Sequence, residues 1–325
     1  MRSSPIVSVI VPNYNYAEYL PERIGSILKQ SFQDFEIIIL DDASKDGSVS
    51  VINSYLFDKR IITNFNSSNS GNPFIQWEKG VSMAKGKYVW IAEADDFSDP
   101  GFLELLVSIM EKNSKINIAY CQSLTTDSNG ITKGTMHSYT DKIWPERWKS
   151  DFLNKGSDEV INYLSYKNTI PNASAVVMRK EPLKKILPEA KHLRYCGDWY
   201  SYVSLLKYGD IYFSSELKNY FRTHSESVRS ELSGSVLHIK ERYLILEHIR
   251  KNFDLPKKTF SDILESISYN WVEFSKERSL KFNDPANKSI LRTALISDPY
   301  AKSRFYKKKI FGIIKDIIKS KEKSE

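Results

Sequence analysis

The stretch Trp90-Ile91-Ala92-Glu93-Ala94-Asp95-Asp96 organises the chain around it. An apolar run that begins at Tyr88 leads into this stretch and is typical of a buried strand in a parallel sheet. The acidic residues fall where that strand should end, and open α/β sheets bind ligands outside the carboxyl ends of their strands. Adjacent carboxylates repel each other, and Mg²⁺ or Mn²⁺ is a partner that suits them. A solvated acidic turn before a helix near Asp99-Pro100 explains the same residues equally well.

Three earlier apolar runs have the same form, because each ends in polar residues. These runs cover residues 6–11, 35–40 and 60–65. Helical patterns separate them, with apolar residues recurring on one face over 19–29 and again after Asp46. A third helix is expected to end near Ala84. The β-α-β-α-β-α-β order predicts a mostly parallel sheet with right-handed crossovers, flanked by helices.

Composition excludes several classes of protein. The net charge of the 325 residues is +7, but residues 302–325 hold nine Lys/Arg and three Asp/Glu, so the main body is nearly neutral. This distribution argues against a nucleic-acid partner. Cys121 and Cys196 form neither a metal-ligand spacing nor a disulfide framework. No signal peptide and no apolar run of about 20 residues is visible, so we expect a cytoplasmic protein.

Four short motifs share one order with a known family. They are Val7 to Asn15 (VSVIVPNYN), Leu40 to Ser48 (LDDASKDGS), Lys85 to Ala92 (KGKYVWIA) and Glu93 to Asp96 (EADD). Together they resemble family 2 glycosyltransferases, the inverting, nucleotide-sugar-dependent group with the GT-A fold. The resemblance covers roughly residues 5–225. It implies an α/β, Rossmann-like, mostly parallel sheet flanked by helices.

The resemblance also implies a divalent metal, Mn²⁺ or Mg²⁺, at the acidic motif. Asp96 is expected to be the direct ligand, with Asp95 nearby in contact with the donor nucleotide. The motif departs from the usual Asp-x-Asp, since Ala94 occupies the first position and Glu93 precedes it. His224 lies in a segment that resembles the loop closing the nucleotide site, and is a second candidate ligand for the metal or for the diphosphate.

The nucleotide is expected to lie along the strand ends. The resemblance implies that Asp41 accepts a hydrogen bond from the base, that Tyr14 stacks on it or packs beside it, and that Pro12 shapes the same loop. Tyr14 is also compatible with a core aromatic residue. Asp42 is compatible with helix capping or with ordering of its loop.

The catalytic base implied by the family is Asp198, in the segment Gly197-Asp198-Trp199. A carboxylate at the start of a helix also has a purely structural explanation, because free N–H groups and the helix dipole favour negative charge there. Both interpretations stay open at this point.

The chain is expected to form a transferase domain over 1–230 and a helical region over 231–325. Helices are predicted over 236–253, 260–274 and 288–296. The final segment, 305–319, mixes isoleucine and phenylalanine with lysines, as in helices that lie on anionic membranes. A terminal helix packed on its own protein gives the same pattern.

These features predict an inverting transfer of a single sugar from a nucleotide-diphosphate sugar, with UDP as the expected nucleotide. The acceptor would be a glycan or a lipid-linked saccharide in surface-polysaccharide assembly, at the inner face of the membrane. The Gln-x-x-Arg-Trp signature of processive synthases is missing, since Trp144 precedes Arg147-Trp148 where Gln is expected. A non-catalytic glycan- or nucleotide-binding protein on the same fold is the alternative. A sugar-1-phosphate nucleotidyltransferase would need a Gly-rich, basic loop near the N-terminus, and this sequence has no such loop.

Overall fold

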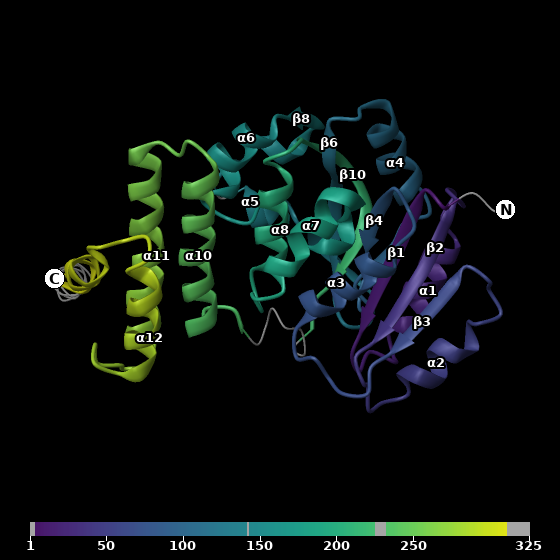
Figure 1. Ribbon diagram of the computed structural model, residues 1–325, viewed down its shortest axis with the longest axis horizontal. Coiled ribbons are helices and arrows are strands. Elements are labelled where there is room, and N and C mark those ends of the chain that lie inside the picture. Colours follow the sequence, from purple (N-terminus) through teal and green to yellow (C-terminus); the bar gives the residue numbers. More distant parts are fainter. Residues whose placement is uncertain (1–3, 142, 225–231, 311–325) are drawn as a thin grey trace, which may run out of the picture. The chain divides into compact units, whose positions relative to one another are not determined.

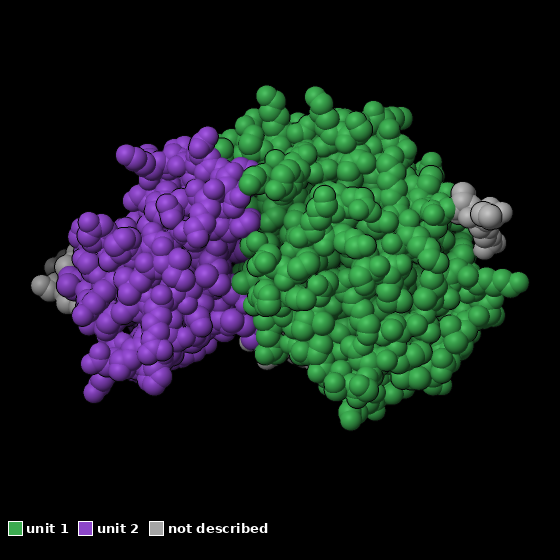
Figure 2. Space-filling model, in the orientation of Figure 1, with its two compact units in different colours: residues 1–227 green, residues 228–325 purple. Residues whose placement is uncertain are grey.

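The computed structural model describes residues 4–141, 143–224 and 232–310. The chain divides into two compact units, residues 1–227 and residues 228–325 (Figure 2). The first unit is built on a single large sheet, and the second is helical (Figure 1).

The sheet of the first unit runs in the order β3-β2-β1-β4-β9-β6-β10-β5, with β7 paired to β6 and β8 paired to β10. Its strands are β1 Val7–Asn13, β2 Phe35–Asp41, β3 Ile61–Phe65, β4 Tyr88–Ile91, β5 Phe97–Ser98, β6 Ile116–Thr126, β7 Thr132–Thr135, β8 Phe152–Asn154, β9 Val176–Arg179 and β10 Asp210–Arg222. Strands β3, β2, β1 and β4 are parallel, as the alternating sequence pattern predicts.

The other half of the sheet is mixed. Strand β9 is antiparallel to both β4 and β6, whereas β10 is parallel to β6. From its sequence, the stretch 172–178 is predicted to be a strand throughout, but residues Ala173–Ala175 form a 3₁₀ turn. The side chain of Asn172 accepts a hydrogen bond from the amide of Ala175, and this local bond delays the strand until Val176.

Helices cover both faces of the sheet. They are α1 Leu20–Leu28, α2 Ser48–Ser54, α3 Pro73–Met83, α4 Phe102–Lys112, α5 His137–Thr140, α6 Gly156–Glu159, α7 Lys180–Ala190 and α8 Gly197–Leu205. Alternate residues of β1, such as Val7 and Val9, pack in one core with residues of α1, α2 and α4. Ile10 points to the other face, where Gly80 of α3 approaches it closely, and α7 and α8 lie on the same side as α3 (Figure 1).

From its sequence, the segment 135–156 is predicted to be irregular, but it contains α5, a 3₁₀ turn at Arg147–Lys149 and β8. Its aromatic residues divide into two groups. Trp148 is buried and donates a 2.7 Å hydrogen bond to the hydroxyl of Tyr120, so it belongs to the core. Trp144 is half-buried, and its ring lies 5.3 Å from that of Tyr163.

The second unit contains α10 Val236–Asn252, α11 Lys257–Glu277 and α12 Pro285–Ala294, close to the predicted helices, and residues 301–310 are also helical. Phe305 is fully buried, with its ring 4.7 Å from Trp271 and 5.1 Å from Phe282. The beginning of the predicted terminal helix therefore packs on its own unit. The rest of that prediction, from residue 311 onward, lies outside the described residues. Among the helices described, none has the length and apolarity to cross a membrane.

Candidate active site

The acidic turn, defined here as Glu93–Asp96, follows β4 and meets the end of β10. The backbone amide of Arg222 donates a 2.8 Å hydrogen bond to Oδ1 of Asp96. Nε2 of His224 lies 2.9 Å from Oδ2 of Asp95. Asp96 is 2% exposed, so its carboxyl group is almost removed from water. The structure thus brings together Asp95, Asp96 and His224, which the sequence places far apart.

Burial and mutual repulsion dominate the electrostatics of this turn. Burial, followed by the charge of Asp95, raises the pKa of Asp96 to about 7. The same two causes, in the same order, raise the pKa of Glu93 to about 8. Burial lowers the pKa of Arg23 to about 10, against the opposing charges of Asp96, Asp95 and Glu93. The buried carboxyl groups of the turn therefore resist ionisation, and a cation beside them would favour their charged forms.

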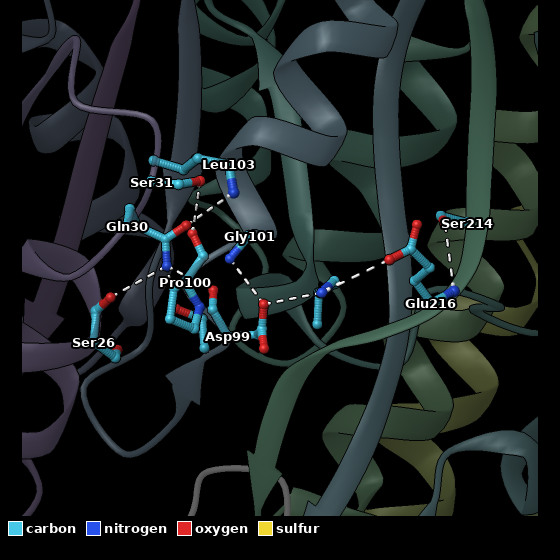
Figure 3. A network of polar contacts seen from close by, with 11 residues as sticks. Ser26, Gln30, Ser31, Asp99, Pro100, Gly101, Leu103, Ser214 and Glu216 are labelled. Carbon is cyan, nitrogen blue, oxygen red and sulfur yellow. Dashed lines mark hydrogen bonds and ion pairs between the residues drawn. The ribbon is translucent and has the colours of Figure 1, made fainter.

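A polar network fixes the segment that follows the turn (Figure 3). The side-chain amide of Gln30, just after α1, donates to the carbonyl of Asp99 at 2.8 Å and accepts from the amide of Leu103 at 2.9 Å. The carboxylate of Asp99 accepts from the amide of Gly101 at 2.8 Å and from Nζ of Lys218 at 3.0 Å. The end of α1, the start of α4 and Lys218 of β10 are thereby tied to the one loop that follows the acidic turn.

The residues expected to bind the nucleotide lie at the ends of β1 and β2. Pro12 is buried in β1, and Tyr14 follows that strand with 41% of its surface exposed, so it is not a core aromatic residue. Asp41 is buried, and its two carboxylate oxygens accept from Nδ2 of Asn13 at 2.8 Å and from the amide of Ser44 at 2.9 Å. A contact with the base of a nucleotide would have to use the remaining lone pairs of the Asp41 carboxylate.

Asp42, the neighbour of Asp41, orders the loop after β3. Its carboxylate accepts hydrogen bonds from Nδ2 of Asn66 at 2.6 Å, from Oγ of Ser70 at 2.7 Å and from Nε2 of Gln76 at 3.0 Å. Of the two structural explanations considered for this residue, these contacts match loop ordering.

Asp198 lies in the first turn of α8 and is half-buried. Its Oδ1 accepts from the amide of Trp199 at 2.6 Å, and its Oδ2 accepts from Nδ2 of Asn168 at 2.9 Å. The pKa of the buried Tyr202 is raised well above its ordinary value by burial and then by the charges of Asp198 and Glu93. The carboxylates of Asp198 and Glu93 therefore act on the same phenol, which puts α8 and the acidic turn in one electrostatic environment.

The donor chemistry of the turn fits a divalent cation. Carboxylates and an imidazole suit Mn²⁺ and Mg²⁺, and a bound cation would offset the burial that raises the pKa of Asp96. Within the described ranges, no three His, Cys, Asp or Glu side chains are grouped to hold a metal. Such cations are usually bound through one or two carboxylates together with substrate phosphates, so two protein ligands suffice.

Sequence reasoning missed several residues that contact the site: Arg23, Trp77, Asn168 and Arg222. One signal was available for Arg23. It lies on α1 beside the apolar positions Leu20, Ile24 and Ile27, so a charge falls within the buried stripe of an amphipathic helix. The other three come from distant elements whose meeting with the acidic turn requires the fold.

Comparison with known proteins shows that this chain is similar to glycosyltransferases. The family model for "Glycosyl transferase family 2" matches residues 8–187. Glycosyltransferase GlyG of Streptococcus pneumoniae is 34% identical over 116 residues, 35% of this chain and 38% of that protein. Bacillus subtilis TuaG, a glycosyltransferase named for teichuronic acid biosynthesis, is 28% identical over 229 residues, 70% of this chain and 82% of its own. The chain thus spans well under half of the first relative and most of the second.

Among solved structures, a fragment of S. aureus TarS in complex with UDP-GlcNAc superposes with a TM-score of 0.70. It is 18% identical, and the match covers 93% of this chain and 89% of that one. This likeness confirms the expected GT-A fold class. Because the family model covers more than half of the sequence, the chain belongs to glycosyl transferase family 2.

Proposed function

We propose that this protein transfers a single sugar, with inversion, from a nucleoside-diphosphate sugar to a hydroxyl of a glycan or lipid-linked acceptor. The observation that carries the proposal is the meeting of β10 with the acidic turn in a family 2 chain. There, Asp95 pairs with His224 at 2.9 Å and Asp96 accepts from Arg222 at 2.8 Å. A carboxylate cluster at the carboxyl end of a parallel strand is suited to a charged, phosphate-bearing ligand that brings its own cation.

Asp198 is proposed as the general base. As the acceptor oxygen bonds to the anomeric carbon, its proton passes to the Asp198 carboxylate, and the bond from that carbon to the diphosphate oxygen breaks. The electron pair leaves with the nucleoside diphosphate. Asn168 donates to Oδ2 of Asp198 at 2.9 Å, which fixes the direction of the carboxylate. No covalent intermediate on the protein is needed.

Asp96 and His224 are proposed to hold the divalent cation, with Asp95 turned toward the donor. A bound Mn²⁺ or Mg²⁺ would neutralise negative charge on the departing diphosphate. The carboxylate of Asp96 keeps one oxygen on the amide of Arg222, so β10 orients it. The pairing of His224 with Asp95 holds the imidazole next to the carboxylates before the cation enters.

UDP is proposed as the nucleotide, and the UDP-GlcNAc bound to TarS supports that choice. Asp41 would accept the N–H of the base, and the exposed ring of Tyr14 would pack against it, with Pro12 shaping the strand end. Asn13 keeps the carboxylate of Asp41 in place through its 2.8 Å bond.

The half-buried aromatic cluster Trp144, Tyr163 and Tyr166 supports a saccharide acceptor. The ring of Trp144 lies 5.3 Å from Tyr163 and 6.3 Å from Tyr166. Tyr166 is two residues before Asn168, the hydrogen-bond partner of Asp198, so the rings and the proposed base belong to neighbouring segments. Aromatic rings offer apolar surface to the C–H faces of sugars.

The proposed setting is surface-polysaccharide assembly at the cytoplasmic face of the membrane, in line with the name of TuaG. In this scheme residues 1–230 form the transferase domain, and residues 231–325 form an accessory helical region that ends in a basic, membrane-contacting segment. No nucleic-acid partner is proposed.

A donor screen tests the function. The protein would be mixed with Mn²⁺, a panel of nucleotide sugars and saccharide acceptors, and the anomeric configuration of any product would be read by NMR. Asp198→Asn should keep donor binding but lose transfer, whereas Asp158→Asn, an exposed acid on α6, should behave as wild type. Donor binding without transfer to any acceptor would favour a non-catalytic binding protein. Normal turnover by Asp198→Asn would remove Asp198 as the base.

A further inference from the structure

Arg23 of α1 is a buried cation with few hydrogen bonds. It is 0% exposed, and its Nε donates a 2.8 Å hydrogen bond to the carbonyl of Glu93. Its two terminal nitrogens, Nη1 and Nη2, have no hydrogen-bond partner among the described residues. A buried charge is costly unless nearby groups compensate it. Something other than hydrogen bonding must therefore stabilise this guanidinium group.

The compensation comes from the acidic turn. The charges that favour the cationic form of Arg23 are those of Asp96, Asp95 and Glu93. Its guanidinium also lies over the ring of Trp90, 5.4 Å from the centroid. The Nε bond to the carbonyl of Glu93 places this cation directly beside the turn.

Arg222 holds the same turn from the β10 side, but in a different way. Its Nε donates to the carbonyl of Asp95 at 2.7 Å, and its terminal nitrogens reach the carbonyl of Ser128 and the carboxylate of Glu22. The guanidinium of Arg222 thus has hydrogen-bond partners of its own, among them the carboxylate of Glu22. Of the two guanidinium groups described at the turn, only that of Arg23 has both terminal nitrogens without a hydrogen-bond partner.

We propose that Arg23 is the resident counter-cation of the acidic turn, a positioning residue that keeps Glu93, Asp95 and Asp96 together when no metal is bound. A metal carried in with the diphosphate would leave with it, so the turn must survive each cycle without one. A guanidinium stays protonated throughout and can balance the turn in that interval. The second test below depends on the proposed metal site, whereas the first test does not.

Arg179 of β9 provides a matched control. Its Nε also donates to a carbonyl, that of Ile116, at 2.8 Å, and its guanidinium lies 5.3 Å from the ring of Tyr88. Its terminal nitrogen Nη2 has carbonyl partners at 3.4 and 3.5 Å. Both Arg23→Met and Arg179→Met therefore lose an Nε bond and a ring contact, although Arg179 is only half-buried. Only Arg23→Met removes charge from beside the acidic turn.

The first test needs no metal. Unfolding temperatures would be measured in chelator at about pH 8.5, where the acidic side chains are mostly ionised. Arg23→Met should lower the temperature, Arg23→Lys should recover most of the loss, and Glu93→Gln should raise the temperature more in the Arg23→Met background than in the wild-type background. If Glu93→Gln raises the temperature equally in both backgrounds, or if neither methionine variant of Arg23 folds, Arg23 is a packing residue and the proposal fails.

The second test adds MnCl₂ to protein that already holds UDP, because the proposed cation site includes the diphosphate. Because the uncompensated turn gains more from a cation, the Mn²⁺-induced rise in unfolding temperature should be roughly twofold larger in Arg23→Met than in wild type or Arg179→Met. An equal rise in all three proteins would overturn the counter-cation role. No rise in any of them would refute the proposed metal site, while the first test would still decide the role of Arg23.

Discussion

Nε1 of Trp77 donates a 3.0 Å hydrogen bond to Oε1 of Glu93, which joins α3 to the acidic turn. Trp77 is 2% exposed, so this bond holds the carboxyl group of Glu93 in the interior. An indole N–H can donate to a carboxylic acid or a side-chain amide as well as to a carboxylate, to which the bond is strongest. The contact therefore keeps Glu93 in place without requiring that it be charged.

Glu93→Gln should make stability less sensitive to pH. The pKa of Glu93 is about 8 in the folded protein, against an ordinary value of 4.5, so the folded state binds this proton more tightly than the unfolded chain. The stabilisation that the proton on Glu93 gives to the folded state is complete at low pH and is lost as the pH rises toward about 8. In chelator, the variant should gain on the order of a few kcal/mol relative to wild type between about pH 5 and about pH 8. Parallel pH profiles of the two proteins in urea denaturation would contradict the buried, raised-pKa carboxyl.

Asn168→Ala should lower turnover more than it changes donor affinity. The side chain of Asn168 donates to Oδ2 of Asp198 at 2.9 Å, so its removal frees the proposed base to rotate. A misdirected general base typically loses between about 10-fold and about 100-fold in kcat. Steady-state kinetics would separate kcat from the KM for the donor, with Asn129→Ala in the exposed turn before β7 as a control. An effect confined to KM would place Asn168 in binding instead.

Gly197→Ala should disturb both stability and catalysis. A Cβ at Gly197 would lie 2.5 Å from the ring of Phe74, so α8 must move away from α3 and carry Asp198 with it. Overpacking of this kind costs about 1–3 kcal/mol. Gly25→Ala in α1 is the matched control, because nothing lies within 4 Å of its Cβ, and it should be neutral or stabilising. Chemical denaturation and kcat would be measured on both variants, and equal behaviour would show that the start of α8 is free to adjust.

The fold was predictable where local pattern and topology agree. The apolar runs from Val7 and Phe35 each end in polar residues, and those residues do meet at one edge, where Asn13 and Asp41 are register partners. The antiparallel direction of β9 was not predictable, because a short buried run looks the same in either direction. Asn168 was missed for another reason, since its role depends on contact with Asp198 across 30 residues. Periodicity identifies the apolar face that contains Phe305, but it does not say whether protein or membrane covers that face.

His224→Ala should weaken nucleotide binding only when metal is present. The imidazole lies 2.9 Å from Asp95 and between the rings of Tyr16 and Tyr19, at 5.6 and 5.5 Å. Loss of a metal ligand, or of the group that orients one, typically costs about 10- to 100-fold in metal affinity. Calorimetric titration with UDP would be run with Mn²⁺ and with chelator, and the exposed His192→Ala would serve as control. A loss of the same size in chelator would make His224 a structural partner of Asp95 and not a ligand.

Removal of residues 311–325 should lower binding to anionic liposomes without lowering the unfolding temperature. A deletion that begins earlier would mislead, because Phe305 is fully buried 4.7 Å from Trp271 and its loss would open the core of the second unit. Residues 311–325 contain Lys315, Lys319, Lys321 and Lys323 among isoleucines, and each basic residue near an anionic surface contributes about 1 kcal/mol of attraction.

Sedimentation with anionic and with zwitterionic liposomes would separate that attraction from apolar insertion. A full-length variant with these four lysines changed to glutamine keeps the apolar residues. If charge draws the segment to the membrane, it should lose binding to anionic liposomes nearly as completely as the deletion does. If the segment instead packs on the protein, the deletion should leave liposome binding unchanged and lower the unfolding temperature, so the two measurements together assign the segment to one surface or the other.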